Sequence, residues 1–485
     1  MREMAMSTPR WARWTDWTRL LPGHLKDQSG RIGRILLLGL ALRIVLLPLF
    51  AGTDAMSTAW ISTVLMAKGQ LILSNDPPPI FYVHALVFQM FRPILPATIL
   101  GRFTSSVAFT PSLFLQESVL TEPGIAVYLA LLKLPYLVFD LATAVLFLWA
   151  IREPGTAVRV FKLWLFNPVV LFATYFIGQF DVVAVFFVVL AFYHNQQGRR
   201  TSTLVALVLA ILFKVFAIVI VPLFLFQWLE KDRGLVVRAK SFAKVAVASV
   251  TPFVLQFLII ILQPVFYESA NYALTGGDLN GFYGTTIYNR GAAANPLLQG
   301  FLTFVGYSSR ISVSSWIPDV FYVLPIAYIL FLVRWVTLRG KDDAQLWNAT
   351  AVLFLLVYAF SLFHAQWFLW AQPFLLLLVA REGKRFTFLY AGIVLLFFVY
   401  IWLWDALLTS VLLVPTIPAA EGWPGPITLL YRAGLPADLI LNLARTAFSV
   451  LCLVLAFLCL RKAWLPTVVT KWLRDRARGI RAGRS

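Results

Sequence analysis

The sequence has few charged residues, two cysteines and four histidines. Charged residues make up 13% of its 485 positions and hydrophobic residues 60%, whereas soluble proteins carry about 25% charged and 45 to 50% apolar residues. Cys452 and Cys459 fall in one late apolar run, so no disulfide framework is in evidence. So few histidines and cysteines also make a catalytic zinc site unexpected. The composition is that of a polytopic helical membrane protein.

The net charge of +19 is concentrated near the two ends of the chain. Basic residues before the first apolar run and after the last one are Arg2, Arg10, Arg13, Arg19, Lys26, Arg31, Arg34, Arg461, Lys462, Lys471, Arg474, Arg476, Arg478, Arg481 and Arg484. Such flanks mark the cytoplasmic side of a membrane and its anionic lipids, which argues against nucleic acid as the partner. Residues 1–32 and 461–485 are therefore predicted to be cytoplasmic at the plasma membrane, the first with a surface helix around Trp14.

The apolar runs predict an all-α fold with about 11 to 13 transmembrane helices within residues 33–460, since one span needs about 17 to 25 apolar residues. Basic loops assign the sides. The expected spans are 33–51, 124–150, 158–177, 181–195, 243–262, 316–335, 346–362, 366–380, 386–408 and 437–460. Segments 52–122 and 263–315 are predicted to be large external loops with interfacial helices.

The run from Thr201 to Trp228 is too long for one upright span, and Lys214 lies at its middle. One alternative is a single outward span, which would place the basic segment 230–244 outside. The other is two short spans hinged near Lys214, which keeps that segment inside. The charge rule favours the hairpin.

Polar residues from distant parts of the chain are expected at one external face. They are Asp54, Gln179, Asp181, Lys214, His364 and Gln366. A carboxylate there could act as a general base on an acceptor hydroxyl, and a cation could stabilise a phosphate leaving group. The alternative for Asp54 is a plain helix start. No GxGxxG, P-loop or HExxH motif competes with this interpretation.

Lys133 and Asp140 lie seven residues apart within one expected span. They share a helix face, and charges inside a membrane are costly. They are expected to pair with each other or to bind a neighbour, and a structural role is favoured over a functional one.

Five segments in order resemble the GT-C class of integral membrane glycosyltransferases, most closely the branch that contains the first mannosyltransferase of GPI-anchor synthesis. They are TDAMSTAW from Thr53, KLPYLVFDLATAV from Lys133, FNPVVLFATYFIGQFDVVAVFFVVLAFY from Phe166, ILFKVF around Lys214, and FHAQWFLWAQPFLLLL from Phe363. The resemblance covers about Arg43 to Val379.

The resemblance implies inverting transfer of one sugar, mannose by default, from a polyprenyl-phosphate sugar donor to a lipid-linked or envelope glycan acceptor at the external face. It makes Asp54 the catalytic base, matches Gln179 and Asp181 to the family's external turn, and gives Lys214 a basic position. Arg290 or Arg310 is expected to help Lys214 bind the donor phosphate. Since Ala55 and Met56 follow Asp54 in place of a DxD pair, no metal and no other cofactor is expected.

Two other classes of function remain open at this point. One is a transporter or lipid flippase, which would place its charges near the midplane in discontinuous helices. The other is a noncatalytic subunit that keeps the GT-C fold within a membrane complex.

Overall fold

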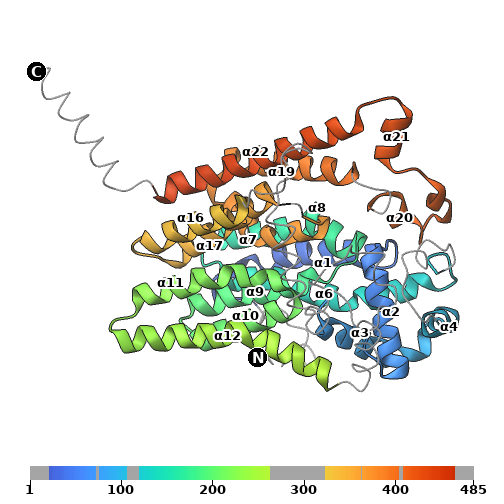
Figure 1. Cartoon of the computed structure of the whole chain (residues 1–485), viewed down its shortest axis with the longest axis horizontal. Helices are drawn as coiled ribbons and strands as arrows, with labels where there is room; N and C mark the ends of the chain where they lie inside the picture. Colours follow the sequence, from blue (N-terminus) through green and yellow to red (C-terminus); the bar gives the residue numbers. More distant parts are fainter. Residues whose placement is uncertain are drawn as a thin grey trace, which may run out of the picture.

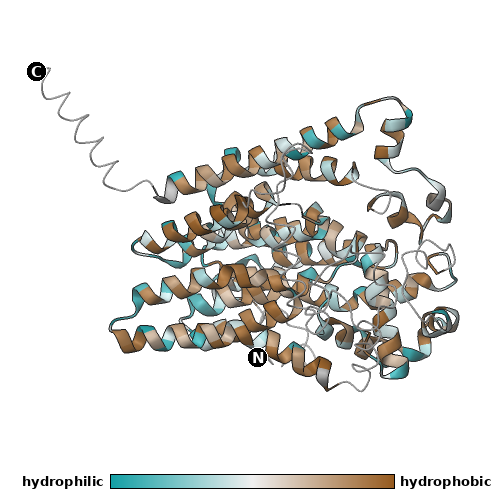
Figure 2. Ribbon diagram, in the orientation of Figure 1, coloured by the Kyte–Doolittle hydropathy of each residue, from teal (hydrophilic) through white to brown (hydrophobic). Residues whose placement is uncertain are grey.

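The computed structural model describes residues 21–72, 76–105, 119–262, 323–361, 363–403 and 408–464. Within these ranges every regular element is a helix (Figure 1), which confirms the all-α prediction. Among the described helices, five are long and apolar enough to cross a membrane, and a bent pair can make a sixth. They are α6 (Ile125–Ala150), α12 (Leu235–Ile261), α17 (Asp343–Phe360), α19 (Lys384–Trp402) and α22 (Ala437–Trp464). Their residues are predominantly apolar (Figure 2).

Further helices complete the bundle. The bent pair joins α7 (Pro154–Leu165) to α8 (Pro168–Leu171) and a π-helical turn (Phe172–Phe176), with a 41° bend. The others include α1 (Ser29–Leu46), α9 (Asp181–Gln196), α10 (Arg200–Phe213), α11 (Val221–Lys231), α16 (Val323–Thr337) and α18 (Gln372–Glu382). Two 3-10 turns, η6 (Val215–Ile220) and η8 (Ala365–Ala371), precede α11 and α18.

The segment predicted as the first external loop contains α2 (Thr53–Lys68), α3 (Pro78–Met90) and α4 (Ala97–Ser105). These three helices gather at one side of the bundle (Figure 1). Ten residues of α2 are buried, so this helix is packed within protein along most of its length. The second predicted loop, 263–315, lies outside the described residues, as do the surface helix around Trp14 and the tail after Trp464.

The chain from Arg200 to Asp232 forms a hairpin. Arg200 Nη1 lies 2.8 Å from Asp232 Oδ1, and Asn195 Nδ2 donates to Gln227 Oε1 at 2.9 Å. The start of α10 and the end of α11 therefore meet, with Lys214 at the far tip of the hairpin. Of the two alternatives for this run, the hairpin is the one observed.

Polar contacts tie further helix ends to the open end of this hairpin. Asp343, the first residue of α17, accepts from Asn195 at 3.0 Å, and Lys341 Nζ donates to Glu230 at 2.7 Å. We call the side of the bundle formed by residues 195–200, 227–232 and 338–343 the basic end. It unites loops that the distribution of lysine and arginine had assigned to one side of the membrane.

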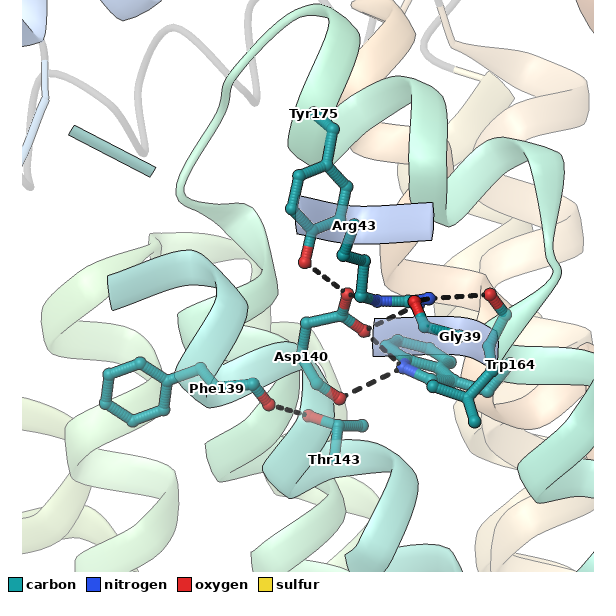
Figure 3. Close-up of polar contacts among 8 residues, drawn as sticks. Gly39, Arg43, Phe139, Asp140, Thr143, Trp164 and Tyr175 are labelled. Carbon is teal, nitrogen blue, oxygen red and sulfur yellow. Dashed lines mark hydrogen bonds and ion pairs between the residues drawn. The ribbon is translucent and has the colours of Figure 1, made fainter. Parts of the chain in front are cut away.

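Asp140 and Arg43 form a buried ion pair in the core of the bundle (Figure 3). Asp140 of α6 accepts from Arg43 Nε of α1 at 2.6 Å, from Tyr175 Oη at 2.7 Å and from Trp164 Nε1 at 2.7 Å. Arg43 also donates to the carbonyl oxygen of Leu165 at 2.7 Å. Both charged side chains are fully buried, so this network joins α1, α6 and α7 in the core. Asp140 thus binds a neighbour and does not pair with Lys133.

Candidate functional site

The approach of α2 to the turn before α9 depends on two glycines. The amide of Gly52 donates to the carbonyl oxygen of Ile177 at 3.0 Å, and a Cβ on Gly52 would lie only 2.7 Å from that oxygen. Gly178 has a φ of +78°, which favours glycine, and a Cβ there would lie 3.0 Å from the Cβ of Ala55. These close contacts bring the start of α2, with Asp54, against the turn that leads to Asp181.

Lys133 binds the two chain segments that lead to Asp54 and Asp181. Its buried Nζ donates to the carbonyl oxygens of Leu47 at 3.0 Å and Tyr175 at 2.8 Å, and also to that of Phe50. These carbonyls belong to the turn after α1 and to the π-helical turn, where the chain leaves regular α-helix and its oxygens lack helical partners. The role of Lys133 is therefore structural, as the sequence favoured: it joins the two segments that carry Asp54 and Asp181.

Asp181, the first residue of α9, is fully buried. Its Oδ1 accepts a hydrogen bond from Trp370 Nε1 at 2.6 Å, and Trp370 stacks on Phe216 with ring centroids 4.0 Å apart. Its other oxygen, Oδ2, lies 3.9 Å from Lys214 Nζ. Asp181 therefore has a fixed orientation between α9, η8 and the hairpin tip.

Lys214 occupies the break between α10 and η6, where its backbone is extended, with φ −153° and ψ 126°. Its Nζ donates to Asp76 Oδ1 at 2.8 Å and lies 4.2 Å from the centroid of the Phe180 ring. The ammonium is thus hydrogen-bonded to Asp76, lies within ion-pair distance of Asp181, and faces one aromatic ring.

Asp54 lies beside this ion-pair group. Its Oδ2 accepts from Gln366 Nε2 at 3.3 Å. The side chain is accessible to solvent, yet enough protein surrounds it that desolvation raises its pKa, and the negative charge of Asp76 raises the pKa further. Lys214, His364 and the hydrogen bond from Gln366 act in the opposite direction. Asp54 is therefore a stronger base than an ordinary aspartate.

His364 is close enough to Asp54 for their charges to interact. Desolvation lowers the pKa of His364, and the opposing effect of Asp54 does not cancel this. The protein therefore favours the neutral form of the imidazole more than water does. Its ring lies edge-on to Trp367, with centroids 5.0 Å apart, and Trp367 in turn stacks on Trp370 at 5.2 Å.

Most residues predicted for the site do meet. The structure brings together the residues that we call the acidic end: Asp54, Asp76, Asp181, Lys214, His364 and Gln366. Gln179 is buried, and its Oε1 has no hydrogen-bond partner among the described residues. Arg290 and Arg310 lie outside the described residues.

Asp76 and Trp370 also belong to the site but were not predicted from the sequence. Asp76 directly precedes Pro77 and the start of α3, and it is the next acidic residue after Asp54 in the chain. Its place in the segment of the expected first external loop was a usable signal. Nothing in the sequence indicated that the indole of Trp370, one of 17 tryptophans, would hold Asp181.

The acidic end combines a carboxylate, the type of group that accepts a proton, with an ammonium, the type of group that binds anions. Asp54 offers an accessible carboxylate of raised basicity, and Lys214 offers an ammonium within the same group of charges. Within the described ranges, no three histidine, cysteine, aspartate or glutamate side chains are grouped so as to hold a metal ion. No protein-family model matches the chain, and no curated protein matches it.

Proposed function

We propose that this chain is a GT-C-type glycosyltransferase. It transfers one sugar, with mannose as the first choice, from a polyprenyl-phosphate donor to a lipid-linked or envelope acceptor at the external face of the plasma membrane. Asp54 removes the proton of the acceptor hydroxyl, and Lys214 stabilises the phosphate that leaves. The observation that carries the proposal is the meeting of Asp54, Lys214 and Asp181, which lie far apart in the sequence, at one end of the bundle.

The chemistry needs little beyond these groups. The base must reach the acceptor hydroxyl and be ionised at the working pH, and Asp54 is both accessible and more basic than usual. The leaving polyprenyl phosphate gains negative charge as the bond to the sugar breaks, and a nearby ammonium stabilises that charge through charge-assisted hydrogen bonds. Arg290 and Arg310 remain candidates for further phosphate contacts.

The hairpin suits a substrate held by a lipid. The 14 residues of α10 span about 21 Å, which is less than the roughly 30 Å of a bilayer's hydrocarbon core. With the basic end at one membrane surface, Lys214 would lie below the opposite surface. A polyprenyl lipid could then present its phosphate to Lys214 while its chain stays in the bilayer.

The transporter alternative has one feature in its favour, the break in the helix at Lys214. In transporters such breaks interrupt a helix that crosses the membrane. Here α10 and α11 return to the same end, so Lys214 lies at the tip of a hairpin. The glycosyltransferase is therefore the function that we retain.

The direct test is to incubate the purified protein with a panel of polyprenyl-phosphate sugars and a membrane lipid extract, and to follow label transfer. We expect one donor sugar to be transferred to an extractable lipid or glycan. The control is Asp54→Asn protein purified in parallel. Transfer from none of the donors, or equal transfer by the variant, would contradict the proposal.

The orientation of the bundle gives a second test. A cysteine at Thr121, just before α6, should react with an impermeant thiol reagent in intact cells, whereas cysteines at Arg199 or Lys384 should react only after lysis. All three positions are exposed, and native Cys452 and Cys459 are buried, so background labelling should be low. Labelling of Arg199→Cys from outside would reverse the assignment of the two ends.

The pH dependence of transfer should report Asp54. Because the base works in its ionised form, kcat/KM should fall as pH decreases through the raised pKa of Asp54. Asp76→Asn removes the charge that contributes to that increase, so the acidic limb should move to lower pH. Glu122→Gln, which alters a carboxylate paired with Arg102, should leave the limb in place. An acidic limb that moves upward in Asp76→Asn would assign the titration to another group.

A further inference from the structure

The two carboxylates that bind Lys214 differ in accessibility. The side chains of Lys214 and Asp76 are 15% and 21% exposed, and that of Asp181 is 0% exposed. A ligand that approaches Lys214 from solvent therefore meets the side occupied by Asp76. The Asp76 contact is also the shorter one, at 2.8 Å against 3.9 Å.

The two carboxylates also differ in how the backbone holds them. Asp181 belongs to α9, and the stacked Trp370 fixes one of its oxygens. Asp76 lies two residues before α3, outside any described helix. A side chain outside a helix can shift at lower cost than one at a buried helix start. Asp76 is thus the partner that can yield its place.

The charges make such a shift necessary for an anion. Among the described residues the acidic end has three carboxylates, Asp54, Asp76 and Asp181, and a single ammonium, and desolvation disfavours a positive charge on His364. A phosphate that joined Lys214 while Asp76 stayed in place would meet a carboxylate at close range. Like charges in such contact are strongly unfavourable.

We propose that Asp76 is a competing anion for the donor phosphate. In the free protein it binds the ammonium of Lys214, and the phosphate of the polyprenyl donor takes this position when the donor binds. This inference rests on the proposed function, because it assigns the phosphate contact of that same site. Asp76 then sets the affinity for the donor, whereas Asp54 acts as the base.

The test measures binding of sugar-free polyprenyl phosphate to the detergent-solubilised protein. Asp76→Asn should bind it about tenfold more tightly than the wild type, a modest part of what like-charge contact costs. Asp76→Glu, which keeps the competing charge, should bind with near wild-type affinity. Glu122→Gln makes the same change in net charge beside Arg102 and should leave the affinity unchanged.

Two further ligands separate the phosphate from the lipid. The corresponding polyprenol, which lacks phosphate, should show no difference between wild type and Asp76→Asn. Inorganic phosphate should show the same direction of change as the lipid if the ammonium alone is responsible, and no binding if the lipid chain is needed to reach it. Should Asp76→Asn not fold, Asp76→Ser gives the same comparison.

Unchanged or weaker binding of polyprenyl phosphate by Asp76→Asn would overturn the inference, since Asp76 would then orient Lys214 for the ligand. Failure of the proposed function has a different signature. If Asp76→Asn binds more tightly but no donor sugar is ever transferred, the phosphate site stands and the transferase activity falls. If sugar transfer occurs while Asp76→Asn binds polyprenyl phosphate with unchanged affinity, the transferase activity stands and the role of Asp76 falls.

Discussion

Asp54→Asn is expected to lower the rate of sugar transfer by roughly 10² to 10⁴, the usual contribution of a positioned general base. The substitution preserves the size of the side chain and its contact with Gln366, but the amide cannot accept the proton of the acceptor hydroxyl. Because Asp54 does not contact the ammonium of Lys214 in the way that Asp76 does, donor binding should persist. Single-turnover transfer and binding of polyprenyl phosphate, measured on the same protein sample, separate the two effects.

The control for this experiment is Asp181→Asn. Asp181 is fully buried and held by Trp370, so its replacement should disturb the position of Lys214 and the affinity for substrates at least as much as the rate. If Asp54→Asn retains near-normal turnover while Asp181→Asn loses it, the base is Asp181. The match between Asp54 and the base of the resembling family would then be misplaced.

Arg43→Met is expected to lower the free energy of unfolding by about 3 to 5 kcal/mol, because it leaves Asp140 as a buried charge without its counterion. Tyr175 and Trp164 still donate to Asp140 at 2.7 Å, but neither carries a positive charge. Thermal or denaturant unfolding of the detergent-solubilised protein measures the change. Arg34→Met is the matched control: it lies in the same helix and is exposed, so it should change stability by less than about 0.5 kcal/mol.

The double variant Arg43→Met, Asp140→Leu tests the cause of this loss. Replacing both charges removes the unpaired carboxylate, so part of the stability should return. It should not return completely, since Tyr175 loses its acceptor and Trp164 keeps only the backbone carbonyl oxygen of position 140, at 3.2 Å. If Asp140→Leu lowers the stability of the Arg43→Met protein as much as it lowers that of the wild type, the two charges do not act as a pair.

Composition and the distribution of charge were sufficient to predict the helical class and which loops share one end of the bundle. The hairpin at Lys214 followed from the same rule, because Glu230–Lys244 had to lie with the other basic loops. Partners inside the bundle were not predictable. Asp140 could be recognised as costly within a span, but its bond to Arg43, 97 positions away in the sequence, depends on how α1 and α6 pack.

The candidate site was predictable as a set of residues at one end, and its contacts were not. Asp54, Asp181, Lys214, His364 and Gln366 could be grouped because each lies at the same end of an expected span. The contact between Lys214 and Asp76 depends on how the start of α3 packs against the hairpin tip. No hydrophobic period predicts that packing.

The hairpin has a consequence for the spacing of the chain. Contacts at the basic end anchor α10 near Arg200, and Lys214 directly follows the last residue of α10. The number of residues between Arg200 and Lys214 therefore sets the position of the ammonium along the helix axis and the direction in which it points. One residue added to α10 would advance Lys214 by about 1.5 Å and turn it by about 100° about the helix axis. The ammonium would then point away from Asp76 and Asp181, although no side chain of the acidic end had changed. Helix length is thereby as strict a requirement at this position as the lysine itself.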